Sequence, residues 1–135
     1  MNKNFTWPVR VYFEDTDAGG VVYYANYLRY LERARSEWLR AMGFDQRKLM
    51  DETGLGFAVR AVAAEYLRPA RLDDELRITC SIKMLGRAQV VFEQTVERGE
   101  ETLLTATVRL ACMDLARGKA AAVPADIYGQ FAKLT

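Results

Sequence analysis

The segment Glu14-Asp15-Thr16-Asp17-Ala18-Gly19-Gly20-Val21-Val22-Tyr23-Tyr24-Ala25-Asn26-Tyr27 carries the most information about this chain. It joins a group of carboxylates to a Gly-Gly pair and then to an aromatic run that leads into a helical pattern. The chain contains no histidine. A general base or carboxylic nucleophile must therefore come from another residue type, and this segment holds the densest group of candidates.

The composition is that of an ordinary globular protein, with 50% hydrophobic and 27% charged residues. A length of 135 residues favours one domain spanning residues 1–135. The net charge of +1 gives no basic face for nucleic acid. No apolar run approaches the ~20 residues of a membrane helix, and the N-terminus lacks the apolar centre of a signal peptide. We therefore expect a cytoplasmic protein without a transmembrane segment.

Hydrophobic periodicity predicts one long helix among several strands. The predicted strands cover residues 9–13, 57–67, 76–84, 89–98 and 104–112, with a short strand after Gly118, and the predicted helices cover residues 25–42, 46–52 and 124–134. Asn26 is a candidate N-cap of the long helix, and Gly43 is placed to end it in a left-handed conformation. Tight turns such as Gly99-Glu100-Glu101 favour an antiparallel sheet, so the chain is expected to be α+β.

Asp17 carries the sharpest functional hypothesis. It precedes the turn into the long helix, where unpaired backbone N–H groups and the helix dipole favour negative charge. A carbonyl held there would be polarised as in an oxyanion hole, and an adjacent carboxylate could attack it or deprotonate a water. An aspartate in a loop more commonly satisfies only the turn amides. Glu14 and Asp15 are alternatives for the same role, and spacing alone does not separate Asp15 from Asp17.

Other residues could contribute to the same site. Gly19 and Gly20 permit close approach of a ligand to the backbone, although a plain tight turn is the more common explanation of such a pair. The backbone N–H of Tyr24 is expected at the helix start, facing a bound carbonyl. Arg87 is a cation in a strand turn that could contact a phosphate, although such an arginine is more often simply solvated. Arg60, Arg68 and Arg71 are open to the same two interpretations. Cys80 and Cys112 fall in apolar runs and are expected to be buried thiols, and neither has the spacing of a metal site.

These residues together resemble a known family. Residues 9–23, with the pattern Asp15-x-Asp17-x-x-Gly20, are similar to the N-terminal signature of hotdog-fold acyl-CoA thioesterases of the 4-hydroxybenzoyl-CoA thioesterase family. The Tol–Pal-associated bacterial subgroup is the closer match. Glu32-Arg33-Ala34-Arg35, Pro69-Ala70-Arg71-Leu72-Asp73-Asp74 and Ala111-Cys112-Met113-Asp114 add to the resemblance, which covers nearly the whole chain.

The resemblance implies a five- or six-stranded antiparallel sheet wrapped around one long helix. It implies Asp17 as the catalytic carboxylate and the amide of Tyr24 as the donor that polarises the thioester carbonyl. It also implies a homo-oligomer, dimer or tetramer, with sites between paired subunits. Two departures stand out: many subgroup members have histidine where this chain has Tyr24, and the stretch Gly86-Arg87-Ala88-Gln89 offers one clear cation for the phosphates of CoA.

The sequence therefore predicts an acyl-CoA thioesterase that releases a free acid and a thiol without a metal or other cofactor, and acyl carrier protein is a second candidate donor. The alternative is an acyl-carrier-protein-binding or Tol–Pal envelope-complex protein with little catalytic activity. A hydratase or dehydratase, the other hotdog activity considered, usually pairs a histidine with a carboxylate. The absence of histidine disfavours that chemistry.

Overall fold

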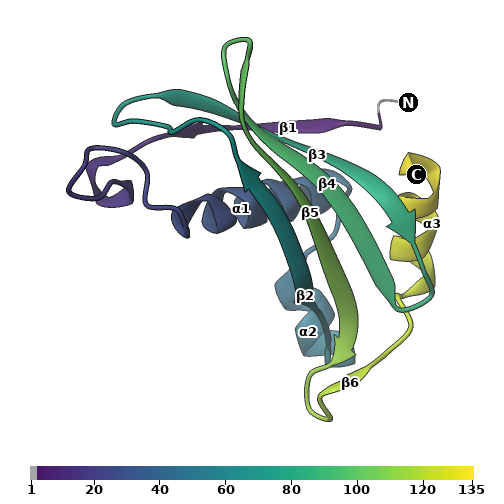
Figure 1. Cartoon of the computed structure of the whole chain (residues 1–135). Coiled ribbons are helices and arrows are strands. Elements are labelled where there is room, and N and C mark those ends of the chain that lie inside the picture. Colours follow the sequence, from purple (N-terminus) through teal and green to yellow (C-terminus); the bar gives the residue numbers. More distant parts are fainter. Residues whose placement is uncertain (1–2) are drawn as a thin grey trace.

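The computed structural model describes residues 3–135 and consists of one curved sheet with three α-helices (Figure 1). The elements follow in the order β1 (Phe5–Arg10), the 3-10 turn η1 (Phe13–Asp15), α1 (Asn26–Ala41), α2 (Gln46–Thr53), β2 (Leu55–Tyr66), β3 (Glu75–Leu85), β4 (Gln89–Arg98), β5 (Glu101–Asp114), β6 (Lys119–Ala120) and α3 (Ala125–Leu134).

All strand pairs in the sheet are antiparallel, and the strand order is β1-β3-β4-β5-β2, with β6 paired to β5. The predicted α+β class and antiparallel sheet are confirmed. In this order β2 is an edge strand, paired along one side with β5. Most of its twelve residues are exposed, among them Val59 at 52% and Val62 at 41%. The edge is thus long and apolar, which is unusual for a strand that faces water.

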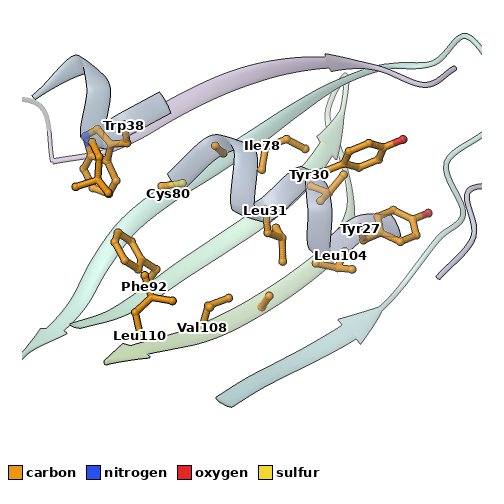
Figure 2. Packing of buried hydrophobic residues seen from close by; sticks show 14 of the residues in the cluster. Tyr27, Tyr30, Leu31, Trp38, Ile78, Cys80, Phe92, Leu104, Val108 and Leu110 are labelled. Atoms are coloured by element: carbon orange, nitrogen blue, oxygen red, sulfur yellow. The ribbon is translucent and has the colours of Figure 1, made fainter. Parts of the chain in front are cut away.

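The sheet curls around α1, which crosses its concave face (Figure 1). The helix buries one side against the strands, with Tyr30, Leu31 and Ala34 fully inaccessible. Figure 2 shows this side facing Ile78, Phe92, Leu104 and Val108 of the sheet. The helix ends where Gly43 adopts φ +94°, as predicted for a left-handed terminus. The hotdog arrangement expected from the resemblance is confirmed.

The far end of the concave face is closed by α3. Phe131 is buried and its ring centroid lies 6.3 Å from those of both Phe57 and Phe92. Cys80 and Cys112 are buried free thiols, as expected, and burial raises the pKa of Cys80 to about 12. Among residues 3–135, no helix combines the length and apolarity that crossing a bilayer requires.

The first strand differs from its prediction. The pattern indicated a strand at residues 9–13, whereas β1 ends at Arg10 and the chain turns into η1. The carboxylate of Asp15 causes this turn, because its Oδ2 accepts the backbone N–H of Tyr12 at 2.8 Å. A β-branched and aromatic run favours a strand locally, but a buried acceptor three residues later bends the chain away from the sheet.

Candidate active site

The candidate site lies on the loop between β1 and α1. Thr16 and Val22 form an antiparallel bridge, and the N–H of Asp17 donates to the carbonyl of Val21 at 2.9 Å. The chain reverses between them through Gly20, whose φ of +77° places it in the left-handed region. A residue with a side chain would be strained in that conformation. The Gly-Gly pair therefore forms a tight turn that presents Asp17.

Asp17 is exposed, and only part of its carboxylate is occupied. Oδ1 accepts the N–H of Gly19 at 2.8 Å, whereas Oδ2 accepts no hydrogen bond from residues 3–135. A Cβ at Gly19 would lie 3.2 Å from Oδ1, closer than an ordinary contact. Glycine at this position thus lets the backbone orient the carboxylate while its second oxygen stays available for chemistry.

Asp15 is saturated instead. It is 8% exposed, and its Oδ1 accepts the side-chain amide of Asn26 at 2.8 Å while Oδ2 accepts the N–H of Tyr12. Burial opposes ionisation, but these hydrogen bonds, with the Tyr30 hydroxyl and the Arg33 guanidinium nearby, hold the pKa of Asp15 below its ordinary value. Both oxygens of Asp15 are engaged in fastening the turn to the helix, so Asp15 has no free oxygen for a substrate.

The start of α1 presents unpaired amides. The backbone N–H groups of Tyr24 and Ala25 donate to no group within residues 3–135, and Ala25, the N-cap, provides no side-chain hydrogen bond. The predicted N-cap role of Asn26 is wrong: Asn26 is the first helical residue, and its side chain turns back to Asp15. The positive end of the helix dipole is thereby left open beside the site loop.

A second segment fixes this geometry, and sequence reasoning assigned it only through the resemblance. The carbonyl of Ala70 accepts the N–H of Val22 at 2.9 Å, and the N–H of Ala70 donates to the hydroxyl of Tyr27 at 2.9 Å. Asp74 holds the segment by an ion pair with Arg98 at 2.7 Å. The backbone carbonyl of Tyr24 also accepts the hydroxyl of Tyr66 at 3.1 Å. These contacts join residues distant in sequence, so no local pattern predicts them.

Two cavities meet at this point. A pocket of about 330 Å³ is lined by Glu14, Asp15, Thr16, Asp17, Tyr23, Ala25, Asn26 and Arg29. A groove of about 470 Å³ between α1 and β2 is lined by Leu28, Arg29, Leu31, Glu32, Arg35, Val59, Val62 and Val108. Arg29 lines both, so the two cavities border each other at this side chain. Among residues 3–135, no cluster of three or more His, Cys, Asp or Glu side chains could hold a metal ion.

The structure brings together most of the predicted site residues. Asp17, Gly19, Gly20 and Tyr24 lie on the one loop that enters α1. Arg87 is exposed in the turn between β3 and β4. The carbonyl of Ala88 in this turn accepts the N–H of Cys112 on β5, and Cys112 pairs with Phe57 near the beginning of β2. The site loop lies instead near the end of β2. Within one chain, Arg87 is therefore at the opposite end of the sheet (Figure 1).

Comparison with known proteins places this geometry in a family. The profile of the thioesterase-like superfamily matches residues 11–131. The acyl-CoA thioesterase YbgC of Haemophilus influenzae is 44% identical over 131 residues, covering 97% of this chain and 96% of the relative. The acyl-CoA thioester hydrolase YbgC of Escherichia coli is 48% identical over 128 residues, covering 94% and 95%.

A solved structure agrees with these relatives. An Asp→Asn variant of 4-hydroxybenzoyl-CoA thioesterase, complexed with 4-hydroxybenzoyl-CoA, matches with a TM-score of 0.87 at 28% identity, covering 96% of this chain and 98% of that one. The chain therefore belongs to the thioesterase-like superfamily of hotdog-fold proteins.

Proposed function

We propose that this protein hydrolyses acyl-CoA thioesters, with Asp17 as the catalytic carboxylate and the Tyr24 amide as the oxyanion donor. The observation that carries the proposal is the exposed carboxylate of Asp17, whose Oδ2 is free, on the loop that leads to unpaired amides at the start of α1. The names of the YbgC relatives support thioester hydrolysis. The solved substrate complex of an Asp→Asn variant supports an essential aspartate.

The reaction follows from this geometry. The thioester carbonyl oxygen accepts the Tyr24 N–H, which stabilises the negative charge that develops on that oxygen. In the nucleophilic route Oδ2 of Asp17 bonds to the carbonyl carbon and the carbon–sulfur bond breaks, which releases the thiolate and leaves an acyl anhydride. Water then cleaves the anhydride and restores Asp17. In the general-base route Asp17 instead takes a proton from the water that attacks the carbonyl carbon, the carbon–sulfur bond breaks, and the proton passes from Asp17 to the departing thiolate.

The same donor explains why tyrosine is acceptable at position 24. The oxyanion contact uses the backbone N–H, which every residue except proline provides. The side chain of Tyr24 is 64% exposed and packs edge-on against Tyr66 with ring centroids 6.3 Å apart. A histidine at this place is therefore not required for the proposed step.

The acyl chain would occupy the groove between α1 and β2. This groove borders the Asp17 pocket at Arg29, and its walls include Leu28, Val59 and Val62. Apolar walls release water when they cover an alkyl or aromatic group, which supplies binding energy without specific contacts.

The site would be completed by a second copy of the chain. The exposed edge of β2 can pair with the same edge of a partner around a two-fold axis. Because the paired strands would run antiparallel, the partner's β3–β4 turn would lie at the same end of the joint sheet as Asp17. The Arg87 side chain would then contact the phosphates of CoA across the interface. Further association into a tetramer and a cytoplasmic location stay predictions.

The alternative, a Tol–Pal or acyl-carrier-protein partner with little catalysis, gains less support. The YbgC relatives are named as thioesterases or thioester hydrolases, and the free Oδ2 of Asp17 supports a catalytic role for this loop. Binding of acyl carrier protein is compatible with hydrolysis, because its acyl group is also carried as a thioester.

A thiol-release screen tests the proposal. Wild type and Asp17→Asn are assayed with short, long and aromatic acyl-CoAs, and we expect release from at least one class that Asp17→Asn abolishes. Absence of release in wild type, or equal rates in the variant, would refute it. Quenching single turnovers with hydroxylamine separates the two routes, because an acyl anhydride at Asp17 gives an aspartyl hydroxamate and the general-base route gives none.

A mixing experiment tests the shared site. Asp17→Asn and Arg87→Ala proteins are each weakened, but a mixed pair contains one site with intact Asp17 and an intact Arg87 from the neighbour. Refolding the two together should restore more activity than the sum of the separate proteins. If Arg87 acts within its own chain, or a native mass measurement finds only monomers, no restoration occurs and the intersubunit site is wrong.

A further inference from the structure

Arg35 is a buried cation that makes no ion pair within residues 3–135, although the carboxylate of Glu32, one turn earlier on α1, attracts it at longer range. It lies on α1 at 6% exposure, and one guanidinium N–H donates to Oε1 of Gln94 at 2.9 Å. The amide of Gln94 is fixed in turn by the carbonyl of Leu31 and the sulfur of Cys80, both at 3.0 Å. No carboxylate in residues 3–135 lies within ion-pair distance of Arg35. Its remaining N–H groups have no partner there.

Such an arrangement is unfavourable for folding alone. Removing a guanidinium from water is costly unless a charge or a full set of acceptors replaces the water. Burial accordingly lowers the pKa of Arg35. A neutral long side chain would fill the same space without this cost, which makes the positive charge a candidate for a role in binding.

The free side of Arg35 faces the groove described above. Arg35 lines that groove together with Leu28, Val59 and Val108, and Val108 and Leu31 lie between the helix and the sheet in Figure 2. The unpaired guanidinium nitrogens of Arg35 keep some contact with solvent. The walls of the groove are mainly apolar, and its charged residues are Arg29, Glu32 and the partly satisfied guanidinium of Arg35.

The groove borders the candidate active-site pocket at Arg29, and Arg35 lies farther along α1. Ala25, Arg29, Glu32 and Arg35 are three or four residues apart and so share one side of α1. Arg35 is nine residues beyond Asn26, or about 14 Å along the helix axis, and side chains lean back toward the helix N-terminus. The groove contains two arginines, Arg29 and Arg35, and one carboxylate, Glu32, so its net charge is positive. The Glu32 carboxylate is exposed and accepts a hydrogen bond from the hydroxyl of Ser36.

We infer that Arg35 is a specificity-determining residue that binds a carboxylate at the far end of the acyl group, so that the preferred substrates are thioesters of dicarboxylic acids. This inference rests on the proposed hydrolase function. A carboxylate is the natural partner because a guanidinium only donates, and a charge-assisted pair compensates its burial. The Gln94 contact holds the guanidinium in position for this pair.

Matched substrate pairs test the inference. The specificity constants of succinyl-, adipoyl- and suberoyl-CoA are compared with those of butyryl-, hexanoyl- and octanoyl-CoA in wild type, Arg35→Met, Arg35→Lys and the control Arg40→Met. Arg40 is exposed on the same helix and pairs with Glu37. In wild type we expect at least one carboxylate-bearing member to exceed its plain partner by about tenfold.

Arg35→Met should remove that preference while hydrolysis of the plain acyl-CoA is retained, Arg35→Lys should keep part of it, and Arg40→Met should leave it unchanged. No preference in wild type overturns the inference, as does an equal loss for both members of each pair, which indicates a structural role. Calorimetric binding of the same pairs to Asp17→Asn separates the two proposals. Selective binding of the carboxylate-bearing members without wild-type turnover would support the role of Arg35 and refute the hydrolase function. Turnover without selective binding would support the hydrolase function and refute the role of Arg35.

Discussion

Asp15 and Asp17 are two residues apart, yet the structure gives them opposite surroundings. Asp15 is buried and both of its oxygens accept hydrogen bonds from Tyr12 and Asn26. Asp17 is exposed, and one of its oxygens is free. The first carboxylate connects the turn after β1 to the first turn of α1, and the second projects from the loop that those contacts hold in place.

The comparison shows how a site divides its tasks. A carboxylate that must react needs an unoccupied oxygen, and a carboxylate that must hold the backbone needs all its acceptors filled. Burial and the supply of N–H donors decide which task each performs. We therefore expect changes at Asp17 to affect turnover and changes at Asp15 to affect stability first.

The largest effect is expected from Asp17→Ala. Loss of the proposed catalytic carboxylate should lower kcat for the best acyl-CoA by at least about a thousandfold. The free energy of unfolding should change by less than about 0.5 kcal/mol, because the side chain is exposed and its one hydrogen bond is local. Thiol release and urea denaturation measure the two quantities. A large loss of stability would mean that Asp17 supports the fold as Asp15 does.

The next effect is expected from Asp15→Asn. An amide cannot accept hydrogen bonds at both positions, so one buried donor loses its partner and the free energy of unfolding should fall by about 1–3 kcal/mol at pH 7. Activity should fall as well, because the loop and the start of α1 would separate. Thermal unfolding followed by circular dichroism, with Glu14→Gln as an exposed control, checks the stability change.

The same variant should alter the pH dependence of stability. The folded-state pKa of Asp15 is lowered, so its contribution is fully present above its unfolded pKa of about 3.9 and is lost as the pH falls through the folded value. Asp15→Asn should therefore show a shallower loss of stability than wild type below about pH 4. Parallel acid unfolding curves for the two proteins would contradict this assignment.

A smaller effect is expected at Gly19 and Gly20, the two glycines of the turn that follows Asp17. A methyl group at Gly19 meets Oδ1 of Asp17 at 3.2 Å, so Gly19→Ala should displace the carboxylate and lower kcat by about tenfold with little change in stability. Gly20→Ala meets no atom within 4 Å but has φ +77°, so it should destabilise by about 1 kcal/mol. Kinetics and melting of both variants would show whether the two effects separate as stated.

The smallest effect is expected from Tyr66→Phe. The variant removes the hydroxyl that donates to the carbonyl of Tyr24 at 3.1 Å. This bond is exposed, so we expect kcat to change by about twofold and stability by about 0.5 kcal/mol. A loss as large as that of Asp17→Ala would show that β2 controls the position of the proposed oxyanion donor, the Tyr24 amide, far more strongly than this single bond implies.

Much of the fold could be predicted from local patterns. The 3.6-residue period of α1 and the left-handed Gly43 gave that helix to within a residue or two, and alternation identified β3, β4 and β5 because each has one buried and one polar face. The end of β1 and the cap of α1 could not be predicted. Both depend on Asp15, whose partners Tyr12 and Asn26 lie on separate elements.

For the site, the sequence by itself determined which residues were available. The chain has no histidine, and the segment before the long helix contains three acidic residues, Glu14, Asp15 and Asp17, followed by a Gly-Gly pair. Only the tertiary structure decided that Asp15 is engaged, that Asp17 keeps a free oxygen, that Arg35 is buried beside a groove and that Arg87 lies far along the sheet. The reason is physical. Residue type sets which bonds a side chain can make, but burial and donors from distant segments decide which of them it does make.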